Sequence, residues 1–355
     1  MAGSPGKAGS SPARPSASPP AAHDSPSSGG EAGEDAPAPL QIDHAYDVHD
    51  DADSSYGSDA ASANTGSISS SIFHYQYENG RRYHAYREGQ YVLPNDDQEQ
   101  ERLNLQHHIW RLLLGGSLYS VPLSDPAPGA EMRVLDLGTG TGVWAIDIAD
   151  EFPSWQVYGF HVDDYEDDWT YRDDEKFDFI HGRALCGTSS DWPRLYGRIK
   201  ENLKPGGWVE IQEYDAWIYS DDDSFERAPW TKEWVEKLDE ASLKFGRQIN
   251  MAKYHKQWMI DAGFEDVVEE VKRIPIGKWA KDPALKELGK FELIHMQMSV
   301  DSHTPALLPE SVAGTAIFYE SNCPTPITAP RPALAASDKG LEIEKHRYIN
   351  GWIMS

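Results

Sequence analysis

Cysteine is nearly absent from this sequence, since its 355 residues include only Cys186 and Cys323. Two cysteines cannot form a disulfide framework, and neither lies at a spacing typical of metal ligands. Long apolar runs are also missing: no stretch approaches the roughly 20 residues of a membrane span, and the polar N-terminus lacks the apolar core of a signal peptide. We therefore expect an intracellular protein, cytoplasmic or nuclear, with no metal site and no membrane partner.

Basic residues are scarce relative to acidic ones. Lys and Arg total 32 against 58 Asp and Glu, which gives a formal net charge of -26 at pH 7. Binding to nucleic acid or to anionic lipid depends on clustered cations. The composition therefore argues against direct binding to nucleic acid.

The chain divides into three parts by composition. Residues 1–70 are mostly small and polar, with too few apolar groups to offset the entropy of ordering, so we predict a disordered acidic tail. Residues 71–308 are expected to form the folded domain, and residues 309–355 an irregular Pro-rich segment. The domain begins with aromatic residues and a helix after Asp96. We interpret this region as a helical packing extension; alternatively, aromatic residues such as Tyr83 form part of a lid over a ligand.

Strand and helix patterns alternate through the first half of the domain. The predicted strands are the buried apolar stretches "RVLDL", "WQVYGF", "KFDFIHGRAL" and "WVEIQEYD", and the predicted helices between them are "VWAIDIADEF" and "DWPRLYGRIKENL". This order is typical of an α/β fold with a parallel sheet.

A glycine loop follows the first of these strands. In "VLDLGTGTGVW", Gly138, Gly140 and Gly142 lie between a strand and a helix, where small residues let the backbone approach a ligand and the helix N-terminus supplies N–H groups. The spacing is GxGxG, and no Gly-Lys-Ser/Thr follows, which excludes a P-loop. Asp136 precedes the loop and could hold an ammonium group, which favours S-adenosylmethionine over a nucleotide phosphate. The alternative is a tight turn without a ligand.

The motifs together resemble one protein family. Their order and spacing over residues 77–307 are similar to those of the LaeA-like S-adenosylmethionine-dependent methyltransferases of filamentous fungi, and the similarity is carried by "ENGRRYHAYREGQYVLPNDDQEQERLNLQHHIW", "VLDLGTGTGVWAIDIADEFP", "DDYEDDWTY", "FDFIHGRAL", "DWPRLY", "LKPGGWVEIQE" and "DAGFEDV". The resemblance implies a Rossmann-like class I methyltransferase sheet. Members either methylate small molecules of secondary metabolism or regulate secondary-metabolite clusters from the nucleus.

The resemblance also implies roles for single residues. Asp136, Gly138 and Gly140 would line the methionine end of S-adenosyl-L-methionine, and Asp164 or Glu166 in "DDYED" would reach the adenine amino group. For the last two residues, a solvated acidic loop is an equally good interpretation.

The chain departs from the family pattern at the end of the second strand. There, an acidic residue should bind the ribose hydroxyls, and a crossover should lead to strand three; Gly159 and Phe160 stand at that point, followed directly by "HVDDYEDD". A parallel crossover needs about a dozen residues, so we expect that strand two or strand three does not pair in the usual way. Loss of the acidic clamp would remove bonds worth about 1.5 to 3 kcal/mol each.

A second departure lies at the C-terminal end of the domain. Six prolines from Pro305 to Pro332 oppose regular strand pairing, so we expect the final antiparallel strand of the sheet to be missing. Both departures are typical of an exon-boundary or reading-frame error in a gene model, or of a decayed paralogue.

Three side chains are candidates for contact with the methyl acceptor or for proton removal, namely His84, His181 and Arg183. Each also has a structural interpretation, because a lone His on a strand is commonly an interior residue with satisfied hydrogen bonds.

Three hypotheses for function remain open. The first is an enzyme that methylates a small molecule. The second is a regulator that works through protein partners, and the third is a pseudoenzyme with impaired cofactor binding. The sequence of the tail contains no Lys/Arg-rich import signal, which favours the enzyme over a nuclear regulator.

Overall fold

The computed structural model describes residues 38–43, 75–78, 81–84, 93–123, 131–160, 169, 171–222, 224–307 and 341–352. All of them belong to one compact unit, residues 37–355. The strands are β1 (Tyr75–Glu78), β2 (Arg81–His84), β3 (Arg133–Leu137), β4 (Gln156–Phe160), β5 (Phe177–Arg183), β6 (Leu203–Tyr214), β7 (Ile218–Tyr219), β8 (Glu265–Ile276) and β9 (Leu341–Trp352). The helices are α1 (Asp97–Leu113), α2 (Val143–Glu151), α3 (Trp192–Asn202), α4 (Pro229–Phe245), α5 (His255–Ala262) and α6 (Pro283–Leu307).

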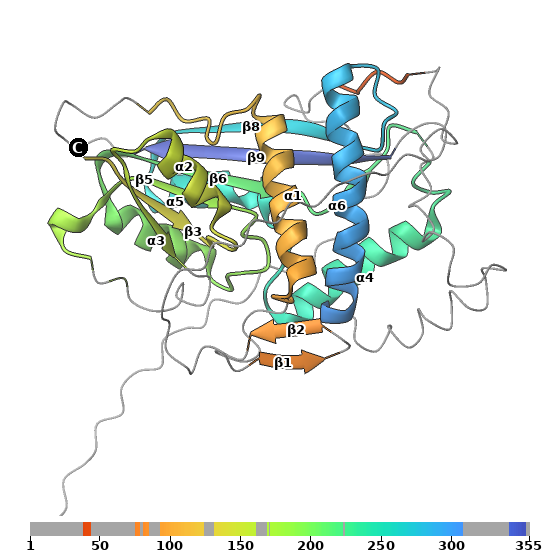
Figure 1. The fold of residues 1–355 in the computed structure, drawn as a ribbon, viewed down its shortest axis with the longest axis horizontal. Coiled ribbons are helices and arrows are strands. Elements are labelled where there is room, and N and C mark those ends of the chain that lie inside the picture. The colour runs from red at the N-terminus through yellow and green to blue at the C-terminus, as the bar shows by residue number, and fades with distance from the viewer. Residues whose placement is uncertain are drawn as a thin grey trace, which may run out of the picture. The chain divides into compact units, whose positions relative to one another are not determined.

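A mixed sheet forms the centre of the fold (Figure 1). Its strands lie in the order β4-β3-β5-β6-β9-β7, with β8 paired to β9. The first four are parallel to their neighbours, and β9 is antiparallel to both β6 and β8. The expected α/β architecture of a class I methyltransferase is confirmed, including the strands and helices predicted from the alternating pattern.

The last strand of the sheet is present, and the expectation that it is missing was wrong. Leu341–Trp352 pairs with β6 from Trp208 to Tyr214 and with β8 over most of its length. The physical reason is the distribution of proline: the six prolines end at Pro332, and the later residues keep every N–H that a central strand needs. Residues 341–352 are therefore not the irregular segment that composition predicted.

The second strand also pairs normally. β4 is in parallel register with β3 over its whole length, from Arg133↔Gln156 to Leu137↔Phe160, so of the two strands whose pairing was in question, strand two pairs with strand one as usual. In the part of the chain that the structure describes, β4 is the edge strand, because "HVDDYEDD" lies outside that part.

Two apolar cores cover the two faces of the parallel strands. On one face Leu135, Leu137 and Ile180 pack under α3 and α5, and on the other Val134 and Phe179 pack with α2 residues. Side chains alternate between faces along a strand. Asp136 and His181, whose positions alternate with those of the first core, therefore lie on the α2 side, beneath the glycine loop.

Helices α1 and α6 lie side by side in front of the sheet (Figure 1). α1 begins at Asp96, whose side chain accepts a hydrogen bond from the Glu99 N–H, as the sequence predicted for this position. Ile109 of α1 is fully buried against Ile274 and Leu288. The helical extension is therefore an integral part of the domain.

A short part of the predicted tail contacts the domain. Ile42 forms an isolated bridge with Ala280, and Asp43 forms an ion pair with Lys286. The tail prediction therefore does not hold for residues 38–43, where the apolar Ile42 and neighbouring backbone pair with the segment before α6.

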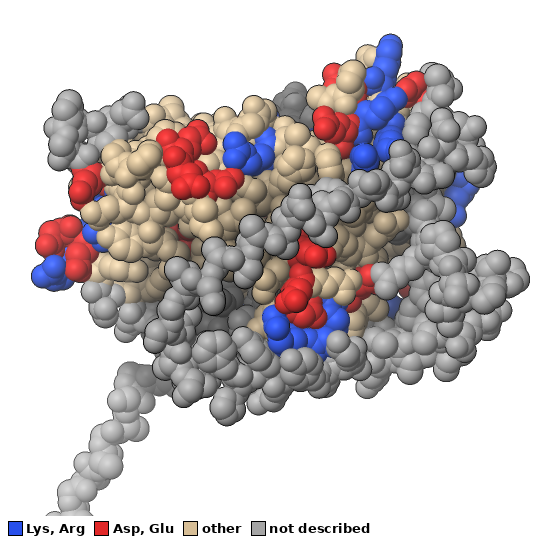
Figure 2. All heavy atoms as spheres, viewed as in Figure 1, with Lys and Arg blue, Asp and Glu red and all other residues tan. Residues whose placement is uncertain are grey.

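The visible surface of the described residues carries charges of both signs (Figure 2). Lys and Arg side chains stand beside Asp and Glu, as in the pairs Lys232–Glu226 and Lys244–Glu240. Among the described helices, none combines the length and apolar character that crossing a bilayer requires.

Candidate cofactor site

The glycine loop turns sharply between β3 and α2. Gly138, Gly140 and Gly142 have φ values of 66°, 55° and 78°, in the left-handed region that favours glycine. The N–H groups of Gly138 and Thr139 donate to the Phe160 carbonyl at 2.8 and 3.2 Å. These two N–H groups therefore anchor the loop to β4 and are not available to a ligand.

Asp136 and His181 form a buried pair directly below this loop. They occupy facing positions of β3 and β5, and the Asp136 Oδ1 to His181 Nδ1 distance is 3.0 Å. The Trp144 indole stacks on the imidazole with ring centroids 3.7 Å apart and an angle of 4°. The stacking and the hydrogen bond therefore together fix the orientation of the His181 ring.

The protonation state of His181 follows from this environment. Burial lowers its pKa, although Asp136 acts in the opposite direction. The neutral ring must carry its proton on Nδ1, because the Asp136 carboxylate is an acceptor. The Nε2 atom, which has no partner among the described residues, then presents a bare lone pair in a fully buried position.

Arg183 is held by three acceptors. Its guanidinium donates to Gln212 Oε1 at 2.7 Å and to the Leu118 carbonyl at 3.3 Å, and it lies 3.1 Å from His107 Nδ1. Because arginine cannot accept a hydrogen bond, His107 must donate through Nε2, which is 3.0 Å from Asp147 Oδ2. Burial, followed by the charge of Arg183, lowers the pKa of His107 to about 4. Arg183 thus joins β5 to α1 and α2.

A pocket of about 430 Å³ opens between the loop and α1. This volume lies within the range of about 300 to 1,000 Å³ that is typical of ligand sites. Asp136, Gly138, Gly140, His181 and Arg183 all border the pocket. The wall opposite the loop is formed by α1 through Glu99, Gln100, Leu103, Gln106 and His107.

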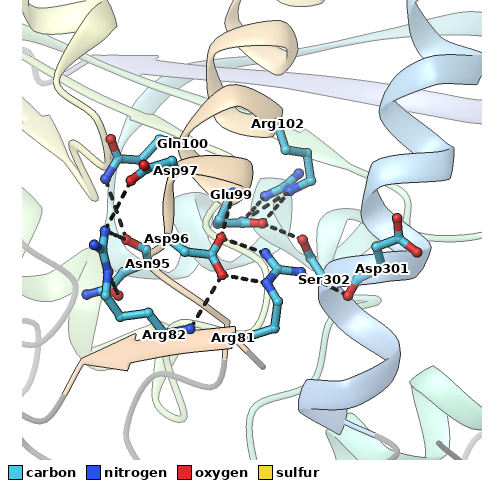
Figure 3. A network of polar contacts seen from close by, with 10 residues as sticks. All are labelled: Arg81, Arg82, Asn95, Asp96, Asp97, Glu99, Gln100, Arg102, Asp301 and Ser302. Atoms are coloured by element: carbon cyan, nitrogen blue, oxygen red, sulfur yellow. Dashed lines mark hydrogen bonds and ion pairs between the residues drawn. The ribbon is translucent and has the colours of Figure 1, made fainter. Parts of the chain in front are cut away.

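The α1 wall is supported by a buried polar network (Figure 3). Arg102 donates to both oxygens of Glu99 at 2.7 to 3.1 Å and reaches His295 Nε2 at 2.8 Å, while Ser302 Oγ donates to Glu99 at 2.6 Å. Arg81 binds the α1 cap Asp96 and also the Asp301 carbonyl at 3.0 Å. The contacts fix α1 against α6, so this side of the pocket is rigid.

The residues fit S-adenosylmethionine at one end of the pocket and not at the other. Near the loop, the open pocket, the positive φ of the glycines and the orphaned His181 Nε2 suit the methionine end of the cofactor. At the end of β4 the ribose clamp is absent from the described residues. A Cβ added at Gly159 would lie 3.0 Å from Thr139 Oγ1, so Thr139 fills the space of an acidic side chain.

The sequence predictions for the site meet different outcomes. His84 lies in β2, paired with Tyr75, and its side chain is outside the described part of the structure, as are Asp164 and Glu166. Gly142 is the N-cap of α2. Sequence reasoning missed His107 and Glu99. His107 meets Asp147 across 40 positions and Glu99 meets Ser302 across 203, which no periodicity relates, whereas the pairing of Glu99 with Arg102 has the local i,i+3 spacing of a helix and could have been found.

Comparison with known proteins identifies the family. A family model described as a methyltransferase domain matches residues 107–271. Methyltransferase pytC of Aspergillus terreus is 37% identical over 266 residues, which cover 70% of this chain and 80% of pytC. The chain belongs to the LaeA-like methyltransferases.

Other relatives in this family carry regulatory names. Secondary metabolism regulator LAE1 of Cochliobolus heterostrophus is 34% identical, over 65% of this chain and 80% of LAE1. Protein-methionine methyltransferase laeA of Emericella nidulans is 31% identical, over 63% of each chain. The family therefore includes proteins with fungal secondary-metabolism functions and at least two kinds of name, methyltransferase and regulator.

Proposed function

We propose that this LaeA-like protein transfers a methyl group from S-adenosyl-L-methionine to a small molecule of fungal secondary metabolism. The observation that carries the proposal is the buried Asp136–His181 pair at the glycine loop, inside a pocket of about 430 Å³. The similarity to pytC supports the methyltransferase activity.

The reaction needs orientation and exclusion of water more than it needs a strong base. S-adenosylmethionine supplies an electrophilic methyl group on a sulfonium. The glycine loop lets the ligand approach the backbone, and Asp136 provides a negative charge for an ammonium group. Neutral His181 could accept a hydrogen bond from an acceptor O–H or N–H through Nε2 once the side chains that cover this buried atom move aside, and this bond would orient the nucleophile. The acceptor itself is not specified by these residues.

Cofactor binding is the first test. Calorimetry with S-adenosylmethionine and S-adenosylhomocysteine should detect binding to the purified chain, and Asp136→Asn should weaken it by about 10- to 100-fold if the carboxylate charge holds the ammonium group. Asparagine can still accept from His181, so the pocket is preserved. If Asp136→Asn binds as tightly as the parent, Asp136 only anchors His181 and the ammonium assignment is wrong.

The role of His181 needs a separate readout. His181→Gln should reduce the rate of methyl transfer to an acceptor from fungal extract more than it weakens binding of S-adenosylhomocysteine. His108→Gln, on the exposed side of α1, is the matched control. Equal losses in rate and binding for His181→Gln would assign it to cofactor binding alone.

A second candidate is a regulator that methylates protein. The name of laeA of Emericella nidulans, a protein-methionine methyltransferase, favours this candidate, while the Gly159 end of β4 favours a weak cofactor site or a pseudoenzyme. Incubation with S-adenosylmethionine labelled in the methyl group separates these candidates. Label in small molecules supports the proposal, label in the chain or in added protein supports the regulator, and absence of cofactor binding supports the pseudoenzyme.

A further inference from the structure

The loop that follows β5 forms part of the pocket wall and has a strained backbone. Ala184, Leu185 and Thr188 border the pocket. Ala184 has a φ of 50°, although it is not a glycine, and its N–H donates to the Gln212 carbonyl at 2.8 Å. A residue in this conformation costs on the order of 1 to 3 kcal/mol and persists only where its surroundings hold it.

Glu213 of β6 lies directly behind this loop. Its side chain is fully buried, and its Oε1 accepts from the Tyr214 N–H at 2.8 Å. Leu185 and Cys186 of the loop lie close enough to this carboxyl group to act on its pKa, and the preceding residue, Gln212, accepts the Ala184 N–H. The other oxygen, Oε2, is buried without a hydrogen-bond partner among the described residues. The buried carboxyl group therefore lies against the loop that forms this wall of the pocket.

We propose that Glu213 is a positioning residue, which holds the Ala184–Thr188 loop and thereby shapes the pocket without touching cofactor or acceptor. The positioning role rests on contacts within the protein. Its consequence for ligand binding rests on the proposed function of the pocket.

The surroundings of Glu213 favour its neutral, protonated form, and in this form it holds the loop. Burial raises its pKa to about 8, and none of the main influences on that pKa is a cation. Other ionisable groups surround Glu213. Cys186 of the loop, Tyr196 of α3 and Tyr214 of β6 are its neighbours. Three further residues, His255, Arg102 and Glu292, in turn act on these neighbours.

The sign of the pH dependence follows from the raised pKa. The folded state binds the proton of Glu213 more tightly than the unfolded state. The contribution of Glu213 to the free energy of unfolding therefore falls as pH rises from its ordinary pKa of 4.5 through about 8. Above that pH a buried carboxylate without a cation must leave its site or admit water. Burial raises the pKa values of Cys186 and Tyr196 well above their ordinary values of 9.0 and 10.0, so neither group titrates in this window.

Thiol labelling tests the positioning role without any ligand. In a Cys323→Ser background, Cys186 is the single cysteine, and it reports on the loop. At about pH 7, Glu213→Ala should raise the labelling rate of Cys186 at least about tenfold, while Glu213→Gln, which mimics the neutral acid, should label at the parental rate. Glu236→Ala, at an exposed position of α4, is the control. Urea unfolding of each variant checks that the fold persists. Equal labelling rates for parent and Glu213→Ala would overturn the proposal.

A binding profile tests the consequence for the pocket. The affinity of the parent for S-adenosylhomocysteine should fall up to about tenfold for each pH unit above 8, and Glu213→Gln should match the parent at pH 7 and lack this decline. A decline shared by both proteins would overturn the assignment to Glu213. If the parent does not bind at pH 7, the proposed function fails, while the labelling experiment still decides the role of Glu213.

Discussion

Replacement of Arg102 with methionine is expected to destabilise the protein by about 3 to 5 kcal/mol. Arg102 and Glu99 are 4% and 1% exposed, and their ion pair lies between α1 and α6 (Figure 3). Methionine keeps the volume of the aliphatic stem and removes the charge. The Glu99 carboxylate would then retain only the Ser302 hydroxyl and the α1 environment, which cannot offset the cost of a buried charge.

The predicted loss of stability arises because Arg102→Met leaves the buried Glu99 charge unpaired. A double variant that removes both charges should therefore recover stability. Glu99→Gln/Arg102→Met removes both charges and should lie within about 2 kcal/mol of the parent, because a buried ion pair replaced as a unit is often close to neutral. Arg172→Met is the matched surface control. Its partner Glu175 is 35% exposed and Arg172 itself 73%, so the loss should stay below about 1 kcal/mol.

Urea unfolding at pH 7, followed by tryptophan fluorescence, measures these differences. The pH dependence gives a second check: Arg102 lowers the pKa of Glu99, so the stability from this pair is present above the ordinary value of 4.5 and is lost as pH falls through the folded-state pKa. The difference between parent and Arg102→Met should therefore shrink in acid. The reasoning is refuted if Arg102→Met loses less than about 1 kcal/mol, or if the double variant is as unstable as the sum of the two single variants.

Three further predictions concern the loop, the tail and β4. Gly140→Ala should cost about 1 to 2 kcal/mol because of its φ of 55°, whereas Gly197→Ala, in open space on α3, should be neutral or stabilising in the same urea assay. Deletion of residues 1–37 should leave the thermal midpoint unchanged, and deletion through residue 43 should lower it by about 2 to 4 °C, because the contacts of Ile42 and Asp43 are lost. Gly159→Asp combined with Thr139→Ala should bind S-adenosylhomocysteine more tightly than either single variant.

The parallel half of the sheet was predictable from local sequence. β3 and β5 are mostly buried apolar runs, β4 is a partly exposed one, and Asp96 and Asp191 signal the starts of α1 and α3, which their side chains cap. These signals depend on neighbours a few residues apart. The glycine loop was predictable for the same reason, since a strand, three glycines and a helix are contiguous.

Several contacts that shape the pocket wall join distant residues and left no local signal. Arg102 meets His295 across 193 positions, and His107 meets Arg183 across 76. β9 was missed because the prolines before it dominated the interpretation of the whole C-terminal segment. Its pairing with β6 and β8 depends on a sheet edge that only the folded domain presents.

We expect the end of β4 to weaken cofactor binding, and the cause lies in the side chains at that end alone. β4 pairs along its full length, and the Phe160 carbonyl anchors the N–H groups of Gly138 and Thr139, so the framework proposed to hold the methionine end is intact. What is lost is the acidic side chain, and Gly159 cannot regain it alone, because an added Cβ would lie 3.0 to 3.2 Å from Thr139 side-chain atoms. Thr139→Ala removes Oγ1 and Cγ2 from that space, and an aspartate could then enter it. Calorimetry on the four combinations therefore distinguishes two causes of weak binding. A gain confined to the double variant identifies the missing clamp, and no gain in any variant places the weakness in the segment after Phe160.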